Sequence, residues 1–280
     1  MPAVPPDTGD EQARSRPVAW VTGASRGMGA DTSVQLARAG YDVALTARDQ
    51  RRLDDVADEV RAEGARALAM ASDLTDRGSI SAFADAALTQ FGRCDVVCNI
   101  GIYQGPGGRQ LVMDTELDEL VVSFEADVVA PVVLCRRALP SMLATGAGTI
   151  VNMSSSSVFL DPPGTIHENG WSFAYVGAKA ALDQLAGILN VELGARGIRA
   201  FNVEPGFVAY GDDLEDALRR YPGVLVSPPE AIGPAIVWLA REPAADRLLS
   251  KRVDLPGLSH KHGLLPGWNG PGTSFASASG

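Results

Sequence analysis

Short apolar runs that alternate with amphipathic stretches constrain the fold of this chain more than any other feature of its sequence. The runs are mostly apolar throughout, which is typical of strands that are buried on both faces of a parallel sheet. We expect strands at 17–22, 41–47, 66–71, 94–100, 148–153, 198–203 and 248–254.

The amphipathic stretches between these runs should form helices that cover both faces of the sheet. They lie at 49–63, 76–91, 115–143, 172–195 and 229–241, and an earlier helix ends at Gly40. Pro131 should bend the helix at 115–143, because proline donates no backbone hydrogen bond. Right-handed crossovers then give an α/β fold with a doubly wound parallel sheet, the Rossmann fold, in a single domain.

The domain is expected at 17–254, after a flexible N-terminal arm at 1–16 and before a C-terminal tail at 255–280 with little periodicity. Three insertions interrupt the pattern, near 102–114, 159–171 and 209–227. Because loops on such a fold carry specificity, we expect these insertions to shape a substrate pocket.

The chain has 280 residues and a net charge of −10. So acidic a surface repels phosphate groups, which argues against nucleic acid and anionic membranes as partners. No apolar stretch approaches the roughly 20 residues of a membrane span, and the first residues contain no signal peptide. Three cysteines without zinc-site spacing indicate a reducing compartment, so we expect a cytoplasmic protein without a metal.

A glycine cluster follows the first expected strand directly. Gly23, Gly27 and Gly29 allow a sharp turn and let the backbone approach a pyrophosphate, while the helix that they open offers unpaired N–H groups to phosphates. A plain strand-to-helix turn is the alternative. The position after the first strand of an α/β pattern favours a dinucleotide site.

The type of dinucleotide depends on the end of the second strand, where an acidic residue usually binds the ribose 2′-hydroxyl of NAD. Arg48 takes that position, and Arg26 adds a second positive charge from the glycine turn. Because guanidinium groups suit a 2′-phosphate, we expect NADP(H), with NAD(H) as the alternative if Asp49 faces the ribose instead.

Tyr175 and Lys179 are four residues apart on an expected helix, so they share one face. A nearby ammonium favours phenolate and should lower the tyrosine pKa from about 10. A phenol tuned in this way can give or take the proton that accompanies hydride transfer. A solvated pair on the helix surface is the alternative.

The segments Thr22-Gly-Ala-Ser-Arg-Gly-Met-Gly29 and Tyr175-Val-Gly-Ala-Lys179 resemble those of the short-chain dehydrogenase/reductase family, and the resemblance extends over about 18–254. It implies that Tyr175 is the general acid/base and that Lys179 also binds the nicotinamide ribose. It further implies that Ser155 binds the substrate oxygen, with Ser154 and Ser156 as alternatives.

The same resemblance implies a set of cofactor contacts from the ends of several strands. They are Gly23, Ser25, Arg26, Gly27, Met28, Gly29, Arg48, Asp73, Leu74, Asn99, Gly101, Tyr175, Lys179, Pro205, Gly206 and Val208. Asp73 resembles the acid that bonds the adenine ring. The family's Asn-Asn-Ala-Gly segment reads Cys98-Asn99-Ile100-Gly101 here.

Two further positions depart from the family pattern. Tyr210 stands where many members have a threonine that bonds the carboxamide. Asp127 stands at the fourth catalytic position, where many members have an asparagine that helps hold a water. We expect the charge of Asp127 to make Tyr175 harder to deprotonate, and a contact at a helix kink is the alternative.

The leading interpretation is therefore an NADP(H)-dependent oxidoreductase that interconverts a ketone or aldehyde and the matching alcohol. We expect a small or medium hydrophobic ketone, a sugar-derived carbonyl, or a steroid-like or polyketide-like compound as the substrate. A dehydratase or epimerase would keep Tyr175 and Lys179 but usually has a larger C-terminal substrate region. A non-catalytic dinucleotide-binding regulator would fit the departures from the family pattern. The resemblance also implies a homodimer or homotetramer formed through the long helices.

Overall fold

The computed structural model describes residues 16–168, 170–209, 214–220 and 223–273. Its centre is a parallel sheet of seven strands in the order β3-β2-β1-β4-β5-β6-β9. The strands are β1 Val18–Thr22, β2 Asp42–Ala47, β3 Ala67–Ala71, β4 Val96–Asn99, β5 Gly148–Met153, β6 Ile198–Glu204 and β9 Arg252–Asp254. The predicted doubly wound α/β fold in a single domain is confirmed.

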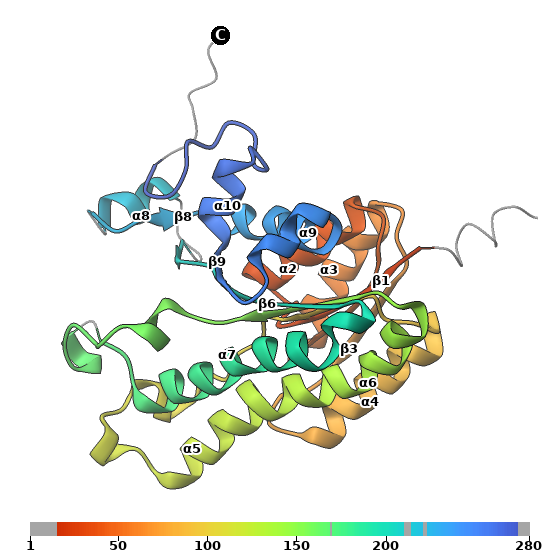
Figure 1. The fold of residues 1–280 in the computed structure, drawn as a ribbon. Helices are drawn as coiled ribbons and strands as arrows, with labels where there is room; N and C mark the ends of the chain where they lie inside the picture. The colour runs from red at the N-terminus through yellow and green to blue at the C-terminus, as the bar shows by residue number, and fades with distance from the viewer. Residues whose placement is uncertain (1–15, 169, 210–213, 221–222, 274–280) are drawn as a thin grey trace, which may run out of the picture.

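Six long helices cover the two faces of the sheet, three on each (Figure 1). On one face lie α2 Gly27–Arg38, α3 Gln50–Ala62 and α9 Ile232–Arg241. On the other lie α4 Arg77–Phe91, α6 Ala130–Thr145 and α7 Phe173–Leu193. Each face has its own hydrophobic core, and the fully buried Trp20 and Phe83 meet edge-on in the second of them.

The long helix expected at 115–143 is divided into two. It consists of α5 Leu117–Phe124, a π-helical segment at Glu125–Val129, and α6. The N–H of Ala130 bonds the carbonyl of Glu125, five residues back. Because Pro131 has no N–H, it cannot continue an α-helical ladder here, so the predicted bend takes the form of a π segment.

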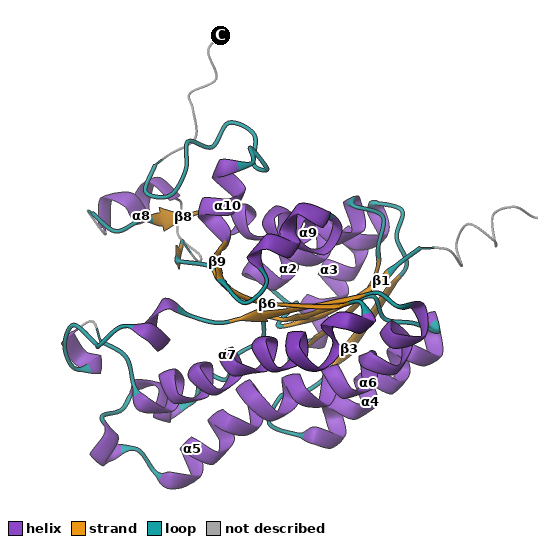
Figure 2. Cartoon of the chain, in the orientation of Figure 1, coloured by secondary structure: helices purple, strands orange, loops and turns teal. Residues whose placement is uncertain are grey.

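The smaller elements gather at the carboxyl ends of the strands (Figure 2). They include α8 Leu214–Arg220 and a two-stranded parallel sheet of β7 Phe207–Val208 and β8 Val226–Ser227. The expected tail begins with an unpredicted helix, α10 Leu255–Lys261. After it, the N–H of Gly272 bonds the carbonyl of Val226 at 2.7 Å, which ties the tail to β8. The expected arm, apart from Arg16, lies outside the described residues.

Candidate active site

The strand order reverses between β1 and β4, and the glycine turn lies at this point. Gly23 and Gly27 have φ values of 68° and 56°, which favour glycine. A Cβ on Gly23 would lie 2.7 Å from the Cα of Gly101, and one on Gly29 would collide with the Gly23 carbonyl. The turn between β1 and α2 therefore presents backbone atoms, without covering side chains, to the crevice where Rossmann folds bind their ligands.

Thr22 joins the two loops that border this crevice. Its Oγ1 accepts the N–H groups of Ile100 at 3.0 Å and Gly101 at 2.9 Å. Ile100 is only 6% exposed and packs in the core, so its bulk points away from the crevice surface. Leu74, which follows β3, lies against Gly101.

Buried polar atoms around the crevice fit a polar ligand. Thr46 Oγ1, Ser72 Oγ and Asn99 Oδ1 have no hydrogen-bond partner within the described chain, although all three are buried. They stand at or just beyond the ends of β2, β3 and β4. Because buried polar groups are normally hydrogen-bonded, these atoms and the glycine cradle together fit a bound dinucleotide.

Arg48 and Asp49 follow β2, and their contacts differ. Asp49 caps α3, since its Oδ1 accepts the N–H of Arg52 at 3.2 Å and its Oδ2 lies 3.4 Å from the Arg52 Nε. Arg48 and Arg26 are exposed. Asp73 accepts both the N–H and the hydroxyl of Thr75 at 2.9 Å. The capping contacts of Asp49 thus turn its carboxylate toward the start of α3.

The expected nicotinamide turn follows β6. Pro205 and Gly206 lead into β7, where Val208 pairs with Ser227, and Gly206 has a φ of 62°. Tyr210 lies outside the described residues.

Tyr175 and Lys179 lie in the first two turns of α7. Ser172 caps this helix by accepting the N–H of Tyr175 at 3.3 Å. Lys179 is 2% exposed, and its Nζ donates to the carbonyl of Met153 at 2.8 Å. The ammonium is therefore fixed between α7 and the end of β5.

The four serines after β5 point in two directions. The Ser154 hydroxyl donates to Asp183 Oδ1 at 2.7 Å. Ser156 lies close enough to Glu204 to lower the pKa of its carboxyl group. Ser155 and Ser157 lie close enough to the phenol of Tyr175 for their hydroxyls to lower its pKa. The geometry therefore favours Ser155 over its two neighbours.

Ser157 is a site residue that the sequence did not indicate. It is buried, and its Oγ donates to the Ser155 Oγ at 2.8 Å. A run of four similar serines carries no signal that separates them. Only the backbone path of the turn shows which hydroxyls face the phenol.

The predicted lowering of the Tyr175 pKa is wrong for this arrangement. Burial raises the pKa of Tyr175, and the charge of Asp127 raises it further, while the hydroxyls of Ser155 and Ser157 lower it. The ammonium of Lys179 is directed at the Met153 carbonyl, and burial lowers its own pKa. An (i, i+4) spacing fixes the face of a helix but not the direction of a long side chain.

Asp127 is 2% exposed and lies within the π segment. Its Oδ1 accepts the N–H of Tyr103 at 2.8 Å, which fixes the start of the first insertion. Burial raises the pKa of Asp127, and Lys179 lowers it. The expected electrostatic influence of Asp127 on Tyr175 is therefore present.

Asparagine side chains run across three neighbouring strands below the site. Asn99, Asn152 and Asn202 are in register on β4, β5 and β6. Asn99 Nδ2 donates to Asn152 Oδ1 at 2.9 Å, and Asn152 Nδ2 donates to Asn202 Oδ1 at 3.5 Å. Asn202 in turn donates to the carbonyl of Asp183 on α7. Sequence reasoning missed this row, because it depends on register.

No described helix is both long and apolar enough to span a bilayer. The residues that the structure describes also contain no group of three His, Cys, Asp or Glu side chains arranged to hold a metal.

Comparisons with known proteins agree with this geometry. A family model described as short chain dehydrogenase matches residues 17–218. An uncharacterized oxidoreductase of Mycobacterium tuberculosis is 31% identical over 252 residues, which are 86% of this chain and 90% of that protein. A cis-4-hydroxycyclohexanecarboxylate dehydrogenase of Sinomonas cyclohexanicum is 34% identical over 243 residues, 84% of this chain and 93% of that protein.

Among solved structures, a metagenomic short-chain oxidoreductase in complex with NADP superposes with a TM-score of 0.67. It is 30% identical, and the match covers 86% of this chain and 98% of that one. The fold, the glycine turn and these relatives lead to one conclusion. This chain belongs to the short-chain dehydrogenase/reductase family and is an oxidoreductase that acts on CH–OH groups with a nicotinamide dinucleotide.

Proposed function

We propose that this enzyme interconverts a small ketone or aldehyde and its alcohol with NADP(H), with Tyr175 as the general acid/base. The observation that carries the proposal is the contact of the Tyr175 phenol with the hydroxyls of Ser155 and Ser157. A phenol and a second hydroxyl side by side can both bond one carbonyl oxygen.

The cofactor would be held by the glycine turn, Arg26, Arg48, the Asp73–Leu74 and Asn99–Gly101 segments, and the turn from Pro205 to Val208. When bound, it supplies or accepts the hydride at the carbonyl carbon. Lys179 binds the nicotinamide ribose in this proposal.

In the reductive direction the phenol of Tyr175 donates its proton to the carbonyl oxygen as negative charge develops there. Ser155 donates a hydrogen bond to the same oxygen, which stabilises the alkoxide-like transition state. Since its pKa is raised, Tyr175 is protonated near neutral pH, which is the form that reduction requires.

The substrate is proposed to have an apolar body. Apolar side chains are exposed after β5, on β7 and just before β8: Leu160, Phe207, Val224 and Leu225. Exposed apolar groups near a catalytic centre favour ligands with matching surface.

The decisive test is Tyr175→Phe, measured on the best substrate from a ketone panel with NADPH. We expect turnover to fall by roughly 10²- to 10⁴-fold, because the general acid is lost. NADPH binding, followed by its fluorescence, should change little. Intact turnover of Tyr175→Phe would refute the proposal, and binding of NADPH by the wild type without turnover on any ketone would favour a regulator.

The preference for NADP(H) rests on Arg48 and Arg26, because the capping contacts of Asp49 turn its carboxylate toward α3. We expect Arg48→Ala to lower kcat/KM with NADPH by roughly 10- to 100-fold, the usual effect of one charge-assisted hydrogen bond, and to leave NADH little changed. Arg247→Ala, at an exposed arginine after α9, is the control. A wild type that prefers NADH would contradict the assignment.

We also propose that the enzyme works in a reducing compartment, the cytoplasm, and forms a homodimer or homotetramer. The three cysteines are buried and free, and burial raises the pKa of the Cys98 and Cys135 thiols to about 12. Exposed apolar side chains on α5 and α7 support self-association.

A further inference from the structure

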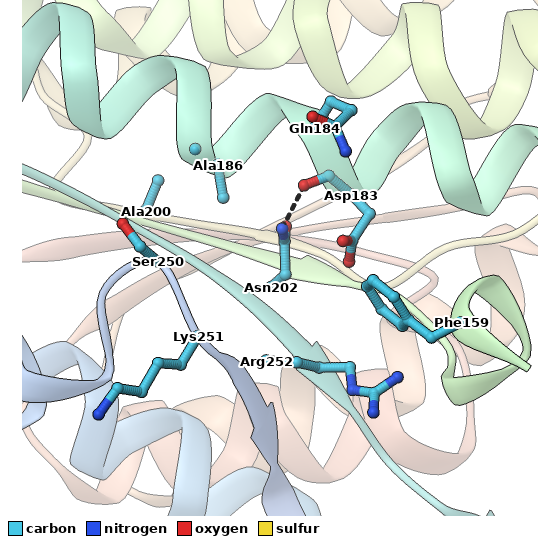
Figure 3. A pocket seen from close by; sticks show the side chains of 10 residues that line it. Phe159, Asp183, Gln184, Ala186, Ala200, Asn202, Ser250, Lys251 and Arg252 are labelled. Atoms are coloured by element: carbon cyan, nitrogen blue, oxygen red, sulfur yellow. Dashed lines mark hydrogen bonds between the residues drawn. The ribbon is translucent and has the colours of Figure 1, made fainter.

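The turn Ser154–Phe159, here called the serine turn, has an open space behind it. A cavity of about 350 Å³ lies between α7, β6 and β9, and Phe159, Asp183, Asn202 and Arg252 line it (Figure 3). The small residues Ala186, Gly187 and Ala200 also line it. Phe159 itself is 56% exposed. Hydrophobic packing therefore cannot fix the serine turn from this side.

Polar contacts take the place of packing. Ser155 is extended, so its neighbours point away from the phenol. The Ser154 hydroxyl donates to Asp183 Oδ1 at 2.7 Å. Ser156 lies close enough to the Glu204 carboxylate to lower its pKa. Each hydroxyl on the side away from Tyr175 thus has an acidic partner.

Arg252 holds the far end of the turn. Its Nε lies 3.4 Å from Glu204 Oε1, and its guanidinium carbon lies 4.4 Å from the centre of the Phe159 ring. Figure 3 shows the side chain extending from β9 toward that ring. One arginine therefore contacts both the acid that lies close to Ser156 and the ring that ends the turn.

Arg252 and Ser156 are the groups that stabilise the charged form of Glu204. Burial raises its pKa, and so do Asp254 and Asp183, while Arg252 and Ser156 lower it. It is the last residue of β6 and directly precedes Pro205, in the expected nicotinamide turn. Glu204 therefore connects the loop that carries Ser155 with the loop expected to contact the cofactor.

We propose that Glu204 and Arg252 are positioning residues that fix Ser155 against Tyr175, acting through Ser156 and Phe159. Neither touches the reacting atoms. The inference rests on the proposed function, since it assigns a purpose to the orientation of Ser155. A small displacement of a catalytic group is enough to slow a reaction, because proximity effects depend steeply on geometry.

The test compares pairs of variants in the whole enzyme. We expect Glu204→Ala and Arg252→Met to lower kcat by roughly ten-fold and to leave the Kd for NADPH within about two-fold. Glu204→Gln keeps a group that accepts from Ser156, and Arg252→Lys keeps a cation over Phe159. Both should retain kcat within about three-fold of the wild type.

Arg199→Met is the matched control. Arg199 also pairs with an acid, Asp246 at 2.8 Å, and lies 5.4 Å from a phenylalanine ring, that of Phe201, but it does not contact the serine turn. Its loss should affect melting temperature and not kcat. If Arg199→Met lowers kcat as much as Arg252→Met does, the effect of Arg252 is merely structural and the inference fails.

A double-mutant cycle tests the route through Ser156. Ser156→Ala should lower kcat about as much as Glu204→Ala, and the double variant should be no slower than either, because both single changes remove the same contact, that between Ser156 and Glu204. If the double variant loses kcat by the product of the two single losses, the inference is wrong. Normal kcat in both Glu204→Ala and Arg252→Met would also overturn it. If Glu204→Ala does not fold, the comparison of kcat between Ser156→Ala and Glu204→Gln still tests the inference. Ser156→Ala should be slow, and Glu204→Gln should stay close to the wild type. If these variants turn over normally while Tyr175→Phe is inactive, the positioning role of Glu204 and Arg252 is refuted, but the proposed function of the enzyme is not.

Discussion

At the scale of single residues, Asp127 places a negative charge in the buried interior of the candidate site, since it is only 2% exposed. Asp127→Asn removes that charge, while the amide oxygen can still accept the N–H of Tyr103. Because the charge raises the pKa of Tyr175, this pKa should fall in the variant. Alcohol oxidation needs phenolate, so we expect its pH–rate profile to reach the plateau at lower pH.

The reductive reaction should respond in the matching direction. It needs the neutral phenol, so its loss at high pH should begin at a lower pH in Asp127→Asn than in the wild type. Glu125→Gln, two residues earlier and paired with Arg77 at 2.5 Å, should leave both profiles unchanged. Identical profiles for the wild type and Asp127→Asn would show that the carboxylate does not influence the phenol.

Sequence reasoning at this scale identified residue types better than directions. Counting from the apolar run selected Ser155, and the structure turns that hydroxyl toward Tyr175. The partner of Lys179 was not predictable, because a backbone carbonyl such as that of Met153 carries no signature in a sequence. Ser157, Glu204 and Arg252 were missed for the same reason, since their importance comes from contacts between distant segments.

At the scale of elements, Pro131 determines the form of the central helix. We expect Pro131→Ala to restore an N–H that can bond the Asp127 carbonyl and so convert the π segment toward α-helix. Asp127 would rotate relative to Tyr103 and Lys179, which should lower kcat by roughly ten-fold while the melting temperature stays the same or rises. Activity and thermal unfolding measured on one preparation check this.

Pro140 provides a matched control in the same helix. It lies inside α6 and is exposed, and the helix around it is α-helical, since the π segment ends at Val129. Pro140→Ala should raise the melting temperature and leave kcat unchanged. A Pro131→Ala enzyme with full activity would separate the π segment from catalysis.

The elements themselves were largely predictable, because buried strands and amphipathic helices differ in periodicity. One exception is α10, which lies in a region rich in glycine and proline. Its start signals were nevertheless present. Asp254 caps the helix by accepting the N–H of Gly257 at 3.2 Å, and a proline occupies its first turn. Composition alone was a poor guide there, since the cap and the proline favour a helix that packs against the rest of the molecule.

At the scale of the whole molecule, the doubly wound arrangement of the sheet followed from general rules of handedness, but cross-strand contacts did not. The row from Asn99 through Asn152 to Asn202 requires the register of three strands, which no local pattern gives. The same holds for the tail, whose bond from Gly272 to Val226 joins segments that are distant in the sequence. By contrast, the side chains that a helix exposes to solvent can be identified as soon as the position of that helix on the sheet is known.

Helices α5 and α7 pack against each other and expose large apolar side chains to solvent. Leu117 and Val121 on α5 are 76% and 65% exposed, and Ile188 and Val191 on α7 are 50% and 88% exposed. Soluble monomers seldom expose such surface, and a symmetric dimer buries the same patch from both subunits at once. We therefore expect light scattering to give two or four times the protomer mass at micromolar concentration.

The double variant Ile188→Asp/Val191→Asp should reduce that mass, because each interface would bury charges without partners. Arg196→Ala, at an exposed position beyond the end of α7, should keep the wild-type mass. Since Tyr175 lies at the other end of α7, NADPH binding by the dissociated variant would show that the dinucleotide site forms within one protomer. A wild type that stays monomeric, or a double variant that keeps its full mass, would mean that these helices face solvent in the working enzyme.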